Sequence, residues 1–133
     1  MLKQLGEFMG SIIVILYSLT ILNYIVKFIN KKYRTQLIKN EVLYKYFMTL
    51  MKLVIKKHKL FGLLTILFIL FHFTLQFNQY GLNITGVIAA SIMLLQVGLG
   101  IYGTITKKRS KPWLMVHRTI AVALLITIII HIV

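Results

Sequence analysis

The chain has 133 residues, of which 59% are hydrophobic, and a mean hydropathy of +0.85. It carries 16 Lys and Arg against 2 acids, and it contains no cysteine. This composition indicates an integral membrane protein and excludes disulfides, iron–sulfur clusters and cysteine-based zinc sites.

Four apolar stretches are long enough to cross a bilayer as helices, by the rule of roughly 20 residues per crossing. They lie at 8–29, 58–77, 83–106 and 112–133. We therefore expect an all-α fold in which residues 1–133 form a single membrane domain, an up-down-up-down four-helix transmembrane bundle. The first apolar run has no small-residue cleavage site, so we expect a retained helix rather than a removed signal peptide.

The basic residues mark one side of this bundle. All Lys and Arg except Lys3 fall between Lys27 and Lys59 or between Lys107 and Arg118. The positive-inside rule makes these connections cytoplasmic and places both termini outside, and we expect a bacterial plasma membrane. Because the charges lie next to the membrane, they favour membrane lipid as a partner and argue against nucleic acid.

The connection between the first two spans has a helical pattern of its own. Over about residues 37–57, apolar residues recur at nearly helical spacing between lysines. This pattern predicts an amphipathic cytoplasmic helix between the first and second membrane helices. Such a helix either lies in the inner headgroup layer, extends the second span inward, or docks a soluble partner.

The chain has 4 histidines, and they bracket the second and fourth spans: His58 and His72 on one, His117 and His131 on the other. Fourteen residues make about four helical turns and about 21 Å of axis, so both histidines of a span point the same way. Because these two helices run parallel, we expect an inner pair, His58 with His117, and an outer pair, His72 with His131.

Two facing imidazoles supply both axial ligands of a haem iron. The pattern therefore predicts two haem b groups stacked across the membrane. Since protein fills both axial positions, it favours electron transfer over chemistry at the metal. The alternatives are interfacial histidines that only form hydrogen bonds, and zinc, for which two imidazoles without an acid or thiol make a poor site.

Small residues accompany the histidines. Gly62 and Ala121 lie one turn from the inner ligands, and Gly86 and Gly100 in the third span are also fourteen residues apart. We expect these positions to clear space for haem, with close helix packing as the alternative.

Polar residues near the same levels complete the expected site. Lys59 and Arg118 are candidates to compensate the inner haem propionates. Asn23, Tyr24 and Gln96 are candidates to line a quinone site, and the alternative is that they are polar groups already satisfied within the bundle.

The paired H-x13-H pattern resembles the di-haem core of cytochrome b in quinol:cytochrome c reductases. It is also similar to ferric reductase and NADPH oxidase membrane domains, where HK or HR opens such a helix, as His58-Lys59 and His117-Arg118 do here. The resemblance implies that the four histidines are haem b ligands and that Gly86 and Gly100 match the third-helix glycines of the cytochrome b core.

The chain departs from these families in three ways. In the first span Gly10 lies at the outer level, but fourteen residues later the chain has Tyr24 rather than glycine. There is no quinol-site loop motif, and there is no flavin or nicotinamide domain. Neither the donor nor the acceptor therefore follows from the resemblance.

Three functions follow as hypotheses. The first is a transmembrane oxidoreductase or cytochrome subunit, of quinone- or metal-reductase type, that passes electrons from a cytoplasmic flavoprotein or a quinol to an acceptor on the other face. The second is a haem-bearing membrane anchor that docks catalytic partners. The third, a small multidrug transporter, needs a carboxylate inside the membrane, but the acids are Glu7 at the outer mouth and Glu41 in the connection.

Overall fold

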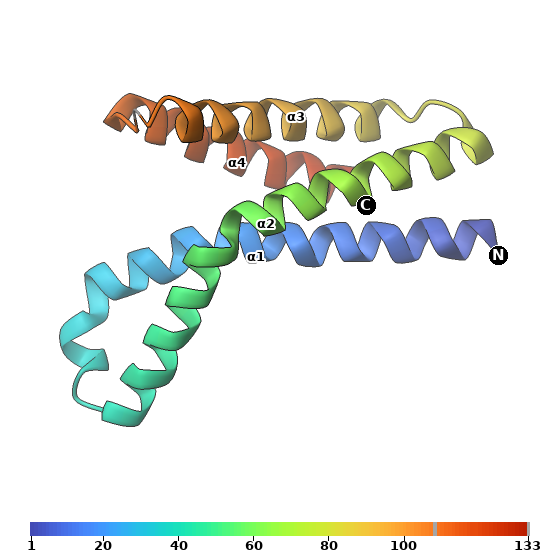
Figure 1. The fold of residues 1–133 in the computed structure, drawn as a ribbon. Helices are drawn as coiled ribbons and strands as arrows, with labels where there is room; N and C mark the ends of the chain where they lie inside the picture. The colour runs from blue at the N-terminus through green and yellow to red at the C-terminus, as the bar shows by residue number, and fades with distance from the viewer. Residues whose placement is uncertain (108, 133) are drawn as a thin grey trace.

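The computed structural model describes residues 1–107 and 109–132, which form four helices (Figure 1). They are α1 (Leu2–Leu37), α2 (Glu41–Tyr80), α3 (Ile84–Ile105) and α4 (Lys111–Ile132). No strand occurs in these two ranges. The predicted all-α four-helix fold is confirmed, and each helix contains a stretch long and apolar enough to cross a membrane.

Capping residues set the helix boundaries. The Asn40 side chain accepts a hydrogen bond from a backbone N–H in the first turn of α2, and Asn83 does the same for α3. Gly81 ends α2 with a φ of 76°, which glycine adopts without strain. The Ser110 hydroxyl accepts from the first turn of α4, where Pro112 fits because its missing N–H has no helical partner to lose.

The helices associate as two antiparallel hairpins. Near the start of α1, Gly6 meets His72 near the end of α2, and near the start of α3, Gly86 meets His131 near the end of α4. We call α1 with α2 the first hairpin and α3 with α4 the second hairpin. Packing within each hairpin is far more extensive than packing of α2 against α3.

A small core joins the two hairpins at mid-height. Tyr17, Met93 and Leu124 are each at most 3% exposed and form one cluster. The Tyr17 hydroxyl donates a hydrogen bond to the backbone carbonyl of Ala121, which ties α1 to α4. This core lies between the levels of the two histidine pairs.

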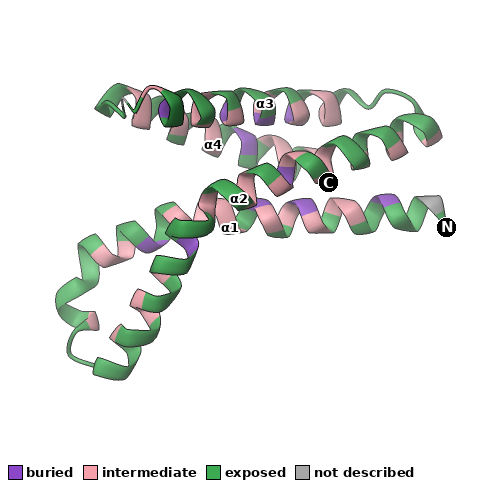
Figure 2. Cartoon of the chain, viewed as in Figure 1, coloured by how far each residue is buried: buried purple, intermediate pink, exposed green. Residues whose placement is uncertain are grey.

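Most of the remaining apolar surface faces outward (Figure 2). The accessible surface is 9673 Å², about a third more than the roughly 7,200 Å² expected for a compact soluble protein of 15.4 kDa. Large exposed apolar side chains occur on all four helices. A lipid environment accommodates such a surface, whereas water does not.

The expected helix over about 37–57 is not a separate element; most of it is an inward extension of the second span, which was one of the alternatives. α1 continues past the predicted end of the first span to Leu37, a short turn follows, and α2 runs without a break from Glu41 to Tyr80. At 1.5 Å per residue α2 is about 60 Å long, twice a hydrocarbon core of roughly 30 Å. The first hairpin therefore has an extension, residues 26–57, that bends away from the second hairpin (Figure 1).

The extension is apolar on two faces and basic on a third. Val26 and Val54 are each 2% exposed, so one face packs between the two limbs. Because α2 turns once every 3.6 residues, a second row of apolar side chains shares another face and is exposed. This exposed apolar stripe consists of Val42, Tyr46, Leu50 and Leu53. Exposed lysines lie beside it at Lys45, Lys52 and Lys56.

Candidate functional site

The histidines of α2 and α4 come together in two pairs. The ring centres of His72 and His131 are 6.3 Å apart, with the ring planes at 85°. His58 lies within electrostatic range of His117. All four rings are half-buried, so each pair sits inside the bundle rather than on its surface.

A backbone carbonyl fixes the proton on the His72 ring. Its Nδ1 is 3.0 Å from the carbonyl oxygen of Gly6. A carbonyl oxygen only accepts, so Nδ1 carries the proton and donates it. The lone pair is then on Nε2, which is the tautomer that binds a metal through Nε2.

A chain of two hydrogen bonds fixes the His131 ring in the same way. The oxygen of the Asn83 side chain accepts from the backbone N–H groups of Thr85 and Gly86, which settles the orientation of that amide. The Thr85 hydroxyl donates to this same oxygen at 2.7 Å. Since its only proton is used there, the hydroxyl accepts from His131 Nδ1, 3.0 Å away. His131 therefore also keeps its lone pair on Nε2.

Three glycines let the helix backbones approach the histidine rings. A Cβ added at Gly86 would lie 3.0 Å from His131 Cε1, tighter than ordinary contact. The corresponding distances are 3.5 Å from Gly10 to His72 Cε1 and 3.9 Å from Gly100 to His117 Cε1. The predicted clearance residues Gly86 and Gly100 thus lie against imidazoles, and Gly10 does the same on α1.

The other two small residues have different surroundings. Apart from the chain neighbours and nearby backbone of its own helix, no described atom lies within 4 Å of a Cβ added at Gly62, so packing does not require glycine there. The Ala121 carbonyl accepts the Tyr17 hydroxyl, which places Ala121 at the contact between α1 and α4.

The inner pair has neighbours that the sequence did not reveal. The Gln96 side chain is buried, and its Nε2 lies 3.3 Å from His117 Nε2. The Trp113 ring stacks on His117 with centres 5.1 Å apart and donates its N–H to the Leu99 carbonyl. Trp113 also lies directly against Gly103, a glycine that could have signalled a bulky neighbour.

Buried polar atoms without a hydrogen-bond partner gather toward the inner end. Over residues 1–107 and 109–132 they are Asn23 Oδ1, Asn30 Oδ1, His58 Nδ1, Gln96 Oε1 and His117 Nδ1. Neither histidine of the outer pair is among them. The inner half therefore has polar groups that the described part of the protein does not satisfy.

The two predicted propionate partners are exposed. Lys59 and Arg118 both lie at the surface, and the Arg118 guanidinium sits 4.9 Å from the centre of the Tyr24 ring. Tyr24, expected as a candidate to line a quinone site, is half exposed and covered by this cation.

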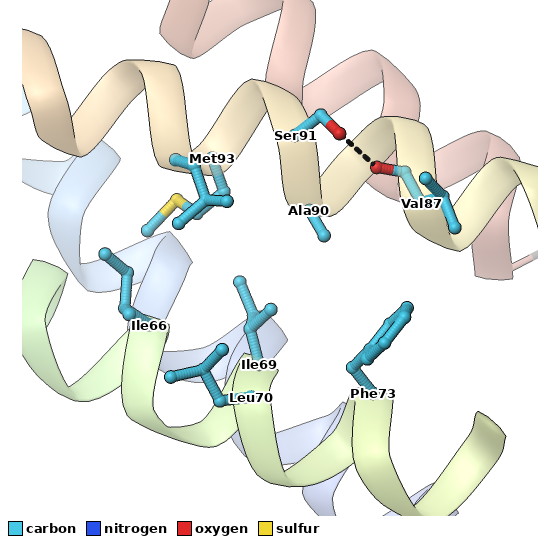
Figure 3. A pocket seen from close by; sticks show the side chains of 9 residues that line it. Ile66, Ile69, Leu70, Phe73, Val87, Ala90, Ser91 and Met93 are labelled. Carbon is cyan, nitrogen blue, oxygen red and sulfur yellow. Dashed lines mark hydrogen bonds between the residues drawn. The ribbon is translucent and has the colours of Figure 1, made fainter. Parts of the chain in front are cut away.

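A cavity of about 230 Å³ lies between α2 and α3, and no histidine lines it (Figure 3). Phe73 and Val87 line it and directly follow His72 and Gly86 in the chain. The Ser91 hydroxyl donates to the Val87 carbonyl of its own helix, so the wall is apolar. The full lining is Ile66, Ile69, Leu70, Phe73, Val87, Ala90, Ser91, Met93 and Leu94.

The separation of the outer rings is that of two imidazoles that would hold one haem iron between them. An imidazole nitrogen binds a metal at about 2 Å and lies about 1 Å from its ring centre, so two rings on opposite sides of one iron have centres about 6 Å apart. The observed 6.3 Å matches this separation, and both Nε2 atoms carry lone pairs. The cavity between α2 and α3 is smaller than the roughly 300–1,000 Å³ of small-molecule sites and has no histidine in its lining.

The inner pair has the side chains that would hold a haem. Its two imidazoles and the open space beside Gly62 suit a haem, but the Gln96 amide must turn away from His117 Nε2. Among the residues that the structure describes, no group of three or more His, Cys, Asp or Glu could hold a metal ion. Two imidazoles are nevertheless a complete protein contribution to haem, because the porphyrin supplies the other four ligands.

No family model matches this chain, and no match was found among curated proteins or among solved structures. The histidine pairs and their hydrogen bonds are therefore the basis on which a function can be argued.

Proposed function

We propose that the protein is a small di-haem b membrane cytochrome that carries electrons across a membrane. The outer haem is held by His72 and His131 and the inner haem by His58 and His117. The observation that carries this proposal is the 6.3 Å separation of the outer rings, one from each hairpin, with both Nδ1 atoms engaged by acceptors.

Haem, when bound, supplies a one-electron Fe(III)/Fe(II) couple. The chain contributes the ligands and the surroundings of the haems. Its four histidines would hold the two haems and leave no ligand position for water or oxygen. The neutral rings avoid the cost of burying charge in lipid. Fourteen helical residues separate the two levels by about 21 Å, most of the hydrocarbon core.

The basic extension gives the proposed orientation. It faces the cytoplasm by the positive-inside rule, the bundle is up-down-up-down across the membrane, and both termini lie outside. The lysines beside the exposed apolar stripe suit an anionic lipid surface. The electron donor is then a cytoplasmic flavoprotein or a membrane quinol.

A second candidate function is a haem-bearing anchor that docks a catalytic partner. The exposed apolar stripe of the extension favours it, because Tyr46 and Val42 are 72% and 65% exposed. Replacing both by serine distinguishes the two functions. An anchor loses electron transfer from its soluble partner while haem content stays unchanged, whereas a free-standing cytochrome reduced by quinol keeps its rate.

The reduced-minus-oxidised spectrum of the purified protein, titrated with a quinol analogue, tests the proposal. We expect b-type haem bands and two haems per chain. A colourless preparation from cells supplied with haem would refute it.

Single histidine variants test the pairing. We expect His72→Ala and His131→Ala each to remove the outer haem and leave the inner one, and His58→Ala and His117→Ala to do the reverse, because each iron needs both of its rings. A pyridine haemochrome assay counts the haem in each variant. Unchanged haem content in all four would contradict the assignment.

A further inference from the structure

The two histidine pairs differ in how their rings are held. In the outer pair both Nδ1 atoms meet an acceptor, the Gly6 carbonyl for His72 and the Thr85 hydroxyl for His131. In the inner pair His117 Nδ1 has no partner within the described ranges, and His117 Nε2 lies against Gln96. The backbone of Thr20 lies beside the His58 ring, but no acceptor meets His58 Nδ1 at full hydrogen-bond geometry. Both outer rings are thus oriented by an acceptor, whereas His117 of the inner pair is not.

We propose that Thr85 is a positioning residue for the outer haem and that the outer site consequently holds its haem more tightly than the inner site. This inference rests on the proposed function. The ring of a metal-binding histidine is oriented and made more basic when its second nitrogen donates to an oxygen acceptor. Thr85 supplies that acceptor to His131.

The Thr85 hydroxyl can play this role because its own proton is committed elsewhere. Asn83 accepts that proton, and the same Asn83 oxygen is fixed by two backbone N–H groups at the start of α3. A freely rotating hydroxyl could instead donate to Nδ1, which would move the ring proton to Nε2 and block metal binding. The helix cap therefore selects the tautomer of a histidine on the neighbouring helix.

Gly86 completes the arrangement. It follows Thr85 directly, and its missing side chain admits the His131 ring to within contact of the α3 backbone. Hydroxyl and glycine together fix both the proton and the position of the ring.

Thr85→Val tests the proposal, since valine keeps the shape and removes the acceptor. We expect a 10- to 100-fold loss in haem affinity at the outer site, as is typical when such a partner is removed. Because the ring becomes less basic, Fe(III) is less stabilised, so we also expect the reduction potential of the outer haem to rise. Potentiometric titration and haem transfer to an excess of a haem-scavenging apoprotein measure the two effects.

The controls separate positioning from folding. Thr85→Ser retains an acceptor and should restore both properties. Thr74→Val makes the same change at a similar depth on α2, where the exposed hydroxyl donates only to the Leu70 carbonyl of its own helix, and should change nothing. The inner haem in each variant reports that the bundle is folded, and Thr85→Ala gives a second truncation if the valine variant is not recovered.

Each outcome supports or overturns one part of the proposal. If the reduction potential and affinity of the outer haem are unchanged in Thr85→Val or Thr85→Ala, Thr85 does not have the proposed role. If the inner haem leaves the unmodified protein more slowly than the outer haem, the proposed order of affinities is wrong. Absence of haem from the unmodified protein is a different outcome, which refutes the proposed function before any variant is compared.

Discussion

At Gly86 a single methyl group decides how closely α3 approaches His131. A Cβ there would meet the ring at 3.0 Å, so Gly86→Ala must displace the imidazole by a few tenths of an ångström. We expect about 1 kcal/mol of destabilisation, typical of overpacking, and weaker haem retention at the outer site. Thermal unfolding in detergent and haem content measure both effects.

Gly98→Ala is the matched control on the same helix. No atom of the described residues lies within 4 Å of a Cβ at Gly98, and alanine is the better helix former by about 1 kcal/mol in water. We expect unchanged haem content and equal or higher stability. Equal effects of the two substitutions would show that the contact with His131 is unimportant.

Gly62 distinguishes packing from cofactor clearance. Since a Cβ added at Gly62 meets open space, we expect Gly62→Leu to leave the haem-free bundle folded. If the inner haem occupies that space, the added side chain lowers inner haem content while the outer haem is retained. Haem counts compared with the unfolding temperature of the haem-free protein test this, and full haem content in Gly62→Leu would place the inner macrocycle elsewhere.

At the scale of helices, Tyr17 links α1 to α4. Its hydroxyl donates to the Ala121 carbonyl from within the central core. Interhelical hydrogen bonds in membrane proteins contribute about 0.6 kcal/mol on average, so we expect Tyr17→Phe to lower the free energy of unfolding by about that amount. Tyr102→Phe, at a residue 56% exposed on α3, is the control and should leave unfolding in mixed micelles unchanged.

The extension should rest on the membrane surface. The chain has no cysteine, so a single introduced cysteine carries a spin label without interference. In nanodiscs with anionic lipid we expect a label at Leu50→Cys, in the exposed apolar stripe, to be shielded from water-soluble relaxation agents and accessible to oxygen, because apolar side chains of surface helices enter the acyl boundary. A label at Lys45→Cys should show the opposite accessibility. The same accessibility at both positions would mean that the extension stands free in water.

Hydropathy and histidine spacing predicted the four helices and the two levels, because both properties are local to each helix. Of the alternatives for residues 37–57, the structure has the inward extension of the second span, because no Gly or Pro interrupts the chain between Glu41 and Gly62 and nothing ends a helix there. The contacts of Gly6, Thr85 and Gln96 with histidines could not be predicted. They depend on how each helix is rotated about its axis, which hydropathy and spacing do not determine.

The quinone hypothesis stays a prediction. Asn23 and Gln96 were expected either to bind quinone or to be satisfied inside the bundle. Over the described residues, Asn23 Oδ1 and Gln96 Oε1 have no hydrogen-bond partner. The protein therefore does not satisfy these two oxygens.

For the whole molecule, sidedness is directly measurable. We expect a cysteine at Lys39, in the turn after α1, to be protected in intact cells from a membrane-impermeant maleimide, because the positive-inside rule makes this side cytoplasmic. A cysteine at Asn78, near the end of α2, should react. Both side chains are exposed in the structure. The reverse pattern would invert the proposed orientation.

Each histidine pair takes one ring from the first hairpin and one from the second, while the protein contacts between α2 and α3 are sparse. Binding one iron through both rings would therefore act as an intramolecular cross-link. If the chain is cut between Tyr80 and Ile84, the two fragments should associate when haem is supplied and dissociate in its absence.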